Sequence, residues 1–159
     1  MKPQEIFEVL RGKFGENASA LNAEQPSPFI QFDRAAIREM MSFLRDDPRL
    51  KFDFLLSISC VDYPKDNLIR VVYHLDSTIH RHTIALKTDV PRDKPVVRSV
   101  LGIWKAADWH EREGWDLMGV TFDGHPNLTR LLMPEDWEGH PLRKDYQQPA
   151  FYHGVPTSY

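Results

Sequence analysis

The chain has 159 residues, of which 42% are hydrophobic and 27% are charged, and its formal net charge is −3. This balance is typical of one globular domain, and it excludes a disordered chain. The apolar runs are far shorter than the roughly 20 residues needed to cross a bilayer, so we expect no membrane span. The first 15 residues lack the apolar core of a signal peptide. The slightly acidic total charge argues against binding to nucleic acid.

The N-terminal part of the sequence predicts a helix, two short strands and a second helix. In chain order these elements cover residues 3–14, 18–24, 29–32 and 33–45. Gly15 is expected to end the first helix, and Asp33 offers an N-cap for the second. Met40 and Met41 fall at helical spacing, so we interpret them as core residues.

Three longer strands follow, over residues 52–61, 68–75 and 80–87. Their short connections predict an antiparallel meander. Alternating apolar and polar residues predict that one face of this sheet packs on the helices. Cys60 is the only cysteine, so it forms no internal disulfide and cannot supply the four thiolates that an iron–sulfur cluster usually requires. We interpret it as a buried small hydrophobe.

After two chain-breaking prolines, Pro91 and Pro95, the apolar spacing favours a short helix over residues 96–104 and another over 106–118, ended by Gly119. The element order predicts an α+β fold. It is a two-layer sandwich built from a helix, two strands, a helix, a three-strand meander and further helices. We expect residues 1–120 to form this domain.

Residues 121–159 predict an extended C-terminal tail, because glycine and proline recur too often for long regular elements. The tail is rich in large apolar side chains, namely Leu131, Leu132, Trp137, Phe151 and Tyr152. Such a segment usually needs a second surface to lie on. We therefore expect the tail to dock on partner subunits, and to be mobile after about Met133 in the isolated chain.

Several polar residues raise the alternative of a free-standing metal-dependent hydrolase using His110, Glu113, Asp123 and His125. The spacing argues against it, because Gly114 stands where an HExxH motif needs its second histidine. Polar pairs on a helix surface explain His110 and Glu113 more simply. The repeated Gly-His-Pro sequences at 124–126 and 139–141 predict turns fixed by imidazole hydrogen bonds.

The segment 109–146, called the signature segment below, concentrates charge, histidine, tryptophan and turn residues. Its uncommon residue pattern resembles the C subunit of the proton-pumping NADH:quinone oxidoreductase, respiratory complex I, which is the thirty-kilodalton subunit in mitochondria. The residues that carry the resemblance, and that are expected at a partner interface, are Glu111, Arg112, Glu113, Trp115, Asp116, His125, Arg130, Trp137, Pro141, Leu142, Arg143, Lys144 and Asp145. Of these, we expect Glu111, Arg112, Glu113 and Asp116 to form ion pairs with the tail or a partner.

The resemblance implies a peripheral-arm subunit that holds no cofactor or metal and has no catalytic residue of its own. FMN, iron–sulfur clusters and quinone would belong to other subunits of the parent complex. The implied partner is chiefly the quinone-site subunit, known as the D subunit, on the cytoplasmic side of the inner or plasma membrane. Similar subunits occur in membrane-bound hydrogenases and in F420- or ferredoxin-dependent dehydrogenases, so the electron donor stays open. A generic adaptor without a redox connection is a further alternative.

Overall fold

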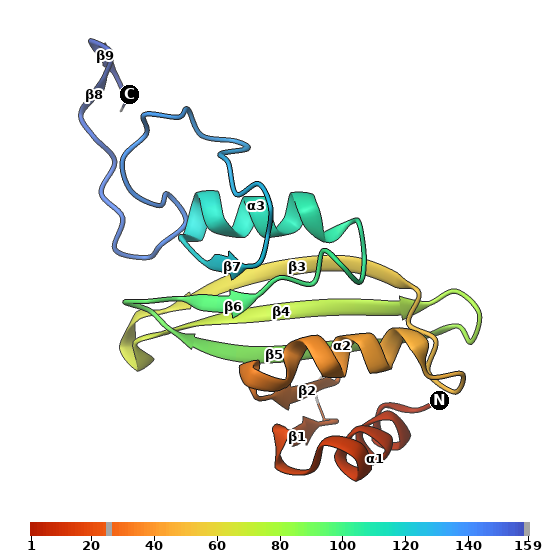
Figure 1. The fold of residues 1–159 in the computed structure, drawn as a ribbon. Coiled ribbons are helices and arrows are strands. Elements are labelled where there is room, and N and C mark those ends of the chain that lie inside the picture. Colours follow the sequence, from red (N-terminus) through yellow and green to blue (C-terminus); the bar gives the residue numbers. More distant parts are fainter. Residues whose placement is uncertain (25–26, 158–159) are drawn as a thin grey trace.

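A five-stranded mixed sheet with helices on one face organises the computed structural model, which describes residues 1–24 and 27–157 (Figure 1). The strand order is β1-β2-β5-β4-β3. Strands β2 and β5 are parallel, and the other neighbours are antiparallel. The elements are α1 (Pro3–Phe14), β1 (Ala18–Asn22), β2 (Phe29–Phe32), α2 (Ile37–Asp46), β3 (Phe54–Tyr63), β4 (Leu68–Ser77), β5 (His82–Pro91), β6 (Val96–Arg98), α3 (Ala107–Met118), β7 (Thr121–Asp123), β8 (Phe151–Tyr152) and β9 (Val155–Pro156).

The predicted α+β sandwich is confirmed. Helix α1 has the predicted limits, and the meander β3-β4-β5 is present, with each strand ending two to four residues later than expected. Asp33 accepts a hydrogen bond from the backbone N–H of Ala35, so it caps a short 3-10 turn that leads into α2. Met40 and Met41 are fully buried, as expected for core residues.

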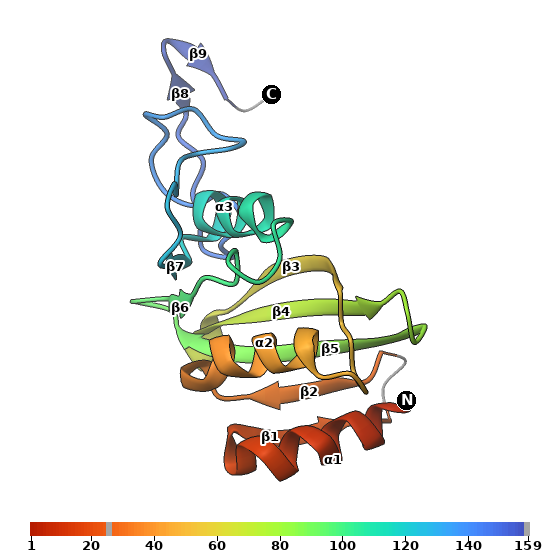
Figure 2. The same cartoon turned by 45° about the vertical axis from the view of Figure 1, so that its right-hand side comes forward.

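The core lies between the sheet and one layer of helices. Helices α1 and α2 cover the sheet near β1, β2 and β5, and α3 lies beside β3 (Figures 1 and 2). In β4 the inward residues alternate along the strand and include Tyr73, whose ring lies 6.2 Å from that of Phe32. None of the helices in the described residues is long and apolar enough to cross a membrane.

The helix predicted over residues 96–104 is wrong. Val96–Arg98 instead form β6, which pairs in parallel with β7 more than twenty residues later in the chain. Valine favours strands, and the pairing with a distant segment is a tertiary effect that helical spacing cannot reveal. Residues 101–103 form a turn, and Trp104 donates its indole N–H to the carbonyl of Phe52 at 3.1 Å.

Helix α3 packs closely on β3 because Gly114 faces the sheet. A Cβ atom at Gly114 would lie 3.0 Å from the Cys60 sulfur and 3.1 Å from the Phe122 ring. The glycine therefore lets α3 approach β3 closely, although glycine lowers the intrinsic stability of a helix. Gly119 ends α3 in the left-handed conformation with φ +74°, which confirms the predicted stop.

The segment expected as a tail, residues 121–159, begins with a strand of the folded core. Phe122 in β7 is fully buried. From Gly124 onward regular structure is scarce, apart from the small β8-β9 hairpin at the far end of the molecule (Figure 1). Ser158 and Tyr159, the last two residues of the expected tail, lie outside the described residues.

Candidate functional site

The signature segment consists of α3, β7 and a long loop that folds back along α3 (Figure 2). Its side chains form several groups of contacts, and most of these join α3 to the loop. The residues of the signature segment therefore fix the position of the loop on α3.

Asp116 holds the first part of the loop. Its carboxylate is fully buried and accepts a hydrogen bond from the guanidinium of Arg130 at 2.7 Å. Its other oxygen accepts the backbone N–H groups of Leu131, Leu132 and Met133, at 3.0, 2.8 and 3.0 Å. One carboxylate thus fixes four donors. The expected ion pair from Asp116 to the tail is confirmed.

The electrostatics of Asp116 favour its charged form. Burial by itself raises the pKa of this carboxyl, but the three backbone N–H donors and Arg130 outweigh burial and hold the pKa below its usual value. The carboxylate is therefore ionised at neutral pH. Arg130 also donates to the carbonyl of Trp137, which extends the same contact further along the loop.

The second part of the loop satisfies the C-terminal carbonyls of α3. His140 Nδ1 lies 3.2 Å from the carbonyl oxygen of Asp116, and the N–H of Leu142 donates to the carbonyl of Leu117 at 3.1 Å. Arg143 donates through Nε to the carbonyl of Met118 at 2.9 Å. The last carbonyls of a helix have no partner inside the helix, and a cation there is favourable to the helix dipole.

The third group joins the loop to the sheet. Arg92, just after β5, forms a bidentate salt bridge with Asp62 in β3, with N–O distances of 2.7 and 3.0 Å. Asp62 also accepts the backbone N–H of Lys144 at 2.8 Å, and Asp145 binds the same Arg92 guanidinium. The Arg92 contact holds the pKa of Asp62 below its usual value against the opposing effect of burial. We expected Arg143, Lys144 and Asp145 at a partner interface; all three have contacts inside the chain, and a role at an interface stays a prediction.

Glu111 does not form the ion pair that we expected. Its carboxyl is fully buried, accepts the hydroxyl of Ser99 at 2.6 Å and the backbone N–H of Val100 at 2.7 Å, and has no cation beside it among the described residues. Burial raises the pKa of Glu111 to about 7, although these two hydrogen bonds oppose the rise. Glu111 therefore fixes the turn after β6.

The remaining residues of the signature segment differ in their roles. Arg112 donates to the hydroxyl of Thr129 at 3.1 Å and to nearby loop carbonyls, so it binds the loop without an ion pair. Glu113 is exposed and has no ion-pair partner among the described residues. Trp115 and Pro141 are half-buried. Trp137 donates its indole N–H to the hydroxyl of Tyr146 at 3.0 Å.

The residues of the metal-site alternative do not come together. His125 Nδ1 accepts the N–H of Asn127 at 3.1 Å, which confirms a turn-fixing imidazole, and its other nitrogen lies 3.1 Å from Asp108. Asp123 lies 3.9 Å from Arg98 instead. Within residues 1–24 and 27–157, no group of three or more His, Cys, Asp or Glu side chains is placed to hold a metal ion. Burial raises the pKa of the Cys60 thiol to about 12, so it is protonated at neutral pH.

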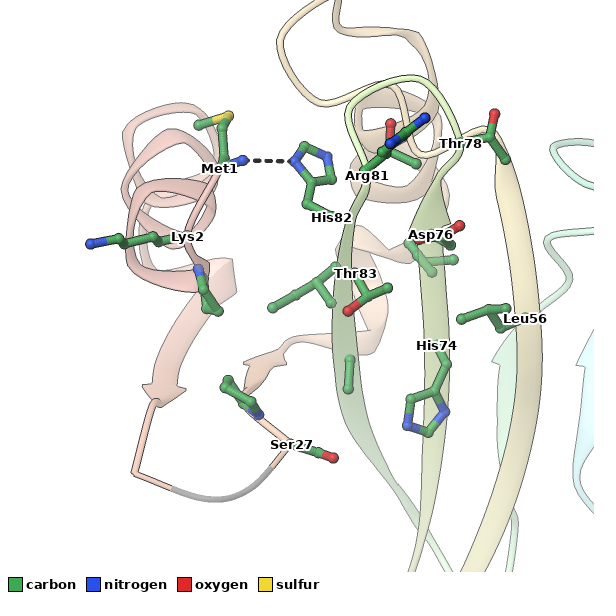
Figure 3. Close-up of a pocket in the computed structure, with 16 residues that line it drawn as sticks. Met1, Lys2, Ser27, Leu56, His74, Asp76, Thr78, Arg81, His82 and Thr83 are labelled. Atoms are coloured by element: carbon green, nitrogen blue, oxygen red, sulfur yellow. Dashed lines mark hydrogen bonds between the residues drawn. The ribbon is translucent and has the colours of Figure 1, made fainter.

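The largest cavity described, about 920 Å³, lies away from the signature segment, between the start of α1 and strands β4 and β5 (Figure 3). At its rim the Met1 amino group lies 3.0 Å from His82 Nδ1, and His82 Nε2 lies 2.7 Å from the carbonyl oxygen of Leu50. Burial lowers the pKa of His82, so its imidazole is neutral and has a structural role.

Sequence reasoning missed Asp62, Arg92 and Ser99. Each is distant in sequence from the signature residue that it contacts, and only the fold brings them together. No local pattern distinguishes them, because all three lie in ordinary strand and turn sequences.

The family model of the 30 kDa subunit of respiratory-chain NADH dehydrogenase matches residues 30–152. The chain belongs to this family. The resemblance expected from the signature segment is therefore confirmed.

Among relatives of this family, the NADH-quinone oxidoreductase C subunit of Chlorobium phaeobacteroides is 41% identical over 155 residues, covering 96% of this chain and 93% of the relative. The same subunit of Chloroherpeton thalassium is 40% identical over 161 residues, covering 99% and 67%. A solved chain described as the trypsin-resistant fragment 1–134 of Nqo5 has a TM-score of 0.68 at 26% identity, covering 80% of this chain and 100% of the fragment. A chain of the archaeal membrane-bound sulfane sulfur reductase, a respiratory membrane complex, has a TM-score of 0.77 at 26% identity, covering 94% and 88%.

Proposed function

We propose that this chain is a cofactor-free scaffold subunit in the peripheral arm of a proton-translocating NADH:quinone oxidoreductase. It supports the electron path from NADH to quinone, while FMN, iron–sulfur clusters and the quinone site belong to other subunits. Relatives about 40% identical over nearly the whole chain carry the name of the NADH-quinone oxidoreductase C subunit, which supports this role. The proposal places the chain on the cytoplasmic side of the membrane, without a catalytic residue of its own.

The observation that carries the proposal is the distribution of exposed apolar side chains. Most of the large hydrophobic residues that are more than half exposed gather on α3 and the tail, and these are Trp109, Leu132, Leu142, Phe151 and Val155. Soluble monomers rarely expose such a concentration, which usually marks an interaction surface. We infer that the surface of α3 and residues 124–157 docks on the quinone-site subunit.

The order of the tail in the isolated chain is part of this proposal. Up to Asp145 the tail has buried partners on α3 and β3, so the mobile part is expected to begin later than Met133. Beyond it, β8 and β9 form a separate two-stranded hairpin, which touches the loop through Asp136, bonded to Tyr152 and His153, and through the Tyr152 ring, 5.0 Å from that of Trp137. Such hairpins are marginally stable in water. The trypsin-resistant Nqo5 fragment aligns with 80% of this chain, which supports a stable domain followed by an accessible segment.

Co-purification tests the docking surface. Phe151 and Ile79 are 64% and 63% exposed, but Ile79 lies in the β4-β5 turn, far from the tail. When the quinone-site subunit is co-expressed, Phe151→Asp should reduce the amount recovered with this chain several-fold, and Ile79→Asp should not. Equal recovery of the two variants would refute the docking surface. Failure of the unchanged chain to recover that partner would refute the proposed function.

The absence of a cofactor has a separate test. The purified chain should show no flavin or iron–sulfur absorbance above about 320 nm, because a single cysteine whose burial keeps it in the protonated thiol form is a poor cluster ligand. A stoichiometric visible band in the isolated chain would contradict the scaffold role.

A second candidate role is the equivalent subunit of another membrane-bound respiratory complex. The likeness to a chain of the sulfane sulfur reductase extends over 94% of this chain, which favours a shared architecture. The higher identity to the relatives from NADH-quinone oxidoreductase favours that enzyme. Electron-transfer assays on the purified complex, with NADH against reduced ferredoxin or F420 as donor, separate the two.

A further inference from the structure

Strand β3 forms one edge of the five-stranded sheet, and its outer side is open. It pairs with β4 from Phe54 to Tyr63, except at the bulged Leu56, and with no other strand of the described chain. In an antiparallel pair every second residue directs its N–H and C=O groups away from its partner. Among the described residues, no other backbone group bonds to this outer side. The edge therefore offers a row of free donors and acceptors.

The opposite edge of the sheet is protected, and the comparison is informative. Strand β1 has only five residues, contains a bulge between Ala18 and Ala20, and lies beside α1 (Figure 2). Proteins protect edge strands with short length, bulges, lysine, proline or a covering element. Strand β3 is ten residues long and carries no lysine or proline, and its one acid, Asp62, is turned inward to Arg92. Helix α3 lies beside it and packs on Cys60 through Gly114, but no strand pairs with its outer side in the described chain. The bulge of β3 lies at the Leu55/Ser57 end and leaves Ser57 to Tyr63 regular.

A groove runs along this open edge. A cavity of about 360 Å³ is lined by four consecutive residues, 57–60, on one side and by α3 on the other, with Leu142 contributing from the tail. Consecutive strand residues point to opposite faces of a sheet. The cavity touches all four, so it reaches the edge of the strand as well as the face on which α3 packs. His110, Glu113 and Leu117 of α3 line the groove.

The chemistry of the β3 edge, together with that of the groove beside it, defines the occupant. Residues 54–61 carry no charge, and the exposed side chains of β3 are largely apolar: Phe54, Leu56, Val61 and Tyr63 are each 37% to 51% exposed. An extended segment with apolar residues at alternate positions matches this surface. Glu113 is the exposed acid of the groove and has no ion-pair partner among the described residues, so it selects a basic residue on the occupant.

We propose that the edge of β3 from Ser57 to Tyr63 binds an apolar-patterned strand of a different subunit, uncharged except for one lysine or arginine placed opposite Glu113. The segment becomes a sixth strand of the sheet and lies beneath α3. Main-chain hydrogen bonds provide the affinity, and the alternating side chains provide the register. This inference rests on the proposed function, because it requires a partner subunit, but it assigns the edge of β3, which adjoins the proposed docking surface and shares α3 and Leu142 with it.

Hydrogen exchange at residue resolution tests the proposal on the full chain and on the purified complex. In the free chain the outward amides of Ser57 to Tyr63 should exchange at least about a hundredfold faster than the inward ones. In the complex both sets should be slow, while the interior strand β4 is protected in both states. Outward amides that stay fast in an otherwise intact complex would overturn the edge pairing and leave the proposed function standing. Protection in the free chain that disappears on dilution would overturn it too, in favour of pairing between two copies.

A variant pair provides a second measurement. Leu142 lines the groove and is 56% exposed, so Leu142→Glu should leave the fold intact while it places an uncompensated charge beside the bound strand. We expect this change to weaken the association between subunits at least about tenfold and to restore fast exchange at the outward β3 amides. Ile79→Glu, at a similarly exposed site away from the groove, should do neither. If Leu142→Glu weakens the association but leaves exchange at these amides unchanged, Leu142 belongs to the tail surface. Its role at the edge of β3 is then overturned.

Discussion

Glu111 is a carboxyl group held inside the protein without a neighbouring cation among the described residues. Its pKa of about 7 lies above the ordinary value of 4.5, so the folded state keeps a proton that the unfolded state releases. Stability from this group is complete below about pH 4.5 and is lost as pH rises through about 7. The expected loss is on the order of 3 kcal/mol. Paired carboxylates such as Asp62 act in the opposite direction, since they lose stability on acidification.

Replacing Glu111 with glutamine isolates this contribution. Glutamine is neutral, and it can accept the N–H of Val100 while donating to the hydroxyl of Ser99. The free energy of unfolding of both chains can be measured in urea between about pH 4.5 and 8. As pH rises, the unchanged chain should lose stability relative to Glu111→Gln. A difference that does not depend on pH would mean that Glu111 has an ordinary pKa.

Asp116 is the residue on which the loop most depends. Asp116→Ala leaves Arg130 and three backbone N–H groups without their shared acceptor. Removing one partner of a buried ion pair typically costs about 3 to 5 kcal/mol, and we expect a loss near the lower value because the freed loop regains water. Chemical denaturation measures the loss. Glu135→Ala, which removes an exposed acid of the same loop without an ion-pair partner among the described residues, should leave the midpoint nearly unchanged.

At the scale of elements, the end of α3 combines a special backbone conformation with a close contact. Gly119 has φ +74°, and a Cβ atom there would lie within 2.5 to 2.9 Å of the His140 ring. That ring is the one that binds the Asp116 carbonyl. The helix stop and the docking of the loop therefore depend on the same glycine.

Two alanine substitutions separate these effects. Gly124 also has positive φ, at +85°, but a Cβ atom there would meet nothing within 4 Å. Gly124→Ala should cost about 1 to 2 kcal/mol from the backbone alone. Gly119→Ala should cost clearly more and should also displace His140, which NMR of the imidazole can follow. Equal losses in melting temperature for Gly119→Ala and Gly124→Ala would show that the contact with His140 does not contribute to stability.

The loop also completes the helix to which it binds. Donors from the loop bond to the carbonyls of Asp116, Leu117 and Met118. These carbonyls accept no hydrogen bond from within the helix. Helix and loop are thus one cooperative unit, and neither is expected to be fully stable without the other. This explains why the signature residues span both segments.

At the scale of the whole molecule, the sheet domain and the loop up to Asp145 are expected to behave as one body, with the β8-β9 end separate. No lysine or arginine follows Lys144, so chymotrypsin is the informative protease. In the free chain it should cleave after Phe151, which is 64% exposed, well before Trp137, Tyr146 or Tyr152. Trp137 bonds to Tyr146, and the Tyr152 ring lies 5.0 Å from that of Trp137.

In the assembled complex the same bonds should resist cleavage, because aromatic side chains at the tail end are then buried in the interface. Equal resistance in the free chain and the complex would make the hairpin an internal element of the domain. Early cleavage at Tyr146 would place the boundary nearer to Met133, as the sequence predicts.

The sequence by itself determined the elements whose cause is local. Periodicity predicted α1, α2, the meander and most of α3, because apolar spacing follows directly from helix and strand geometry. Gly119 and Asp33 were identified as a helix stop and a cap for the same reason. The residue pattern of the signature segment also revealed the family.

Only the tertiary structure decided features that join distant segments. Val96–Arg98 became a strand because β7 lies beside it, and the parallel pairing of β2 with β5 has no sequence signal. Glu111 became a buried, cation-free acid because Ser99 and Val100 fold over it. The physical reason is common to all these cases: a pairing or a desolvated charge depends on which groups the whole chain brings together, and local spacing carries no information about that.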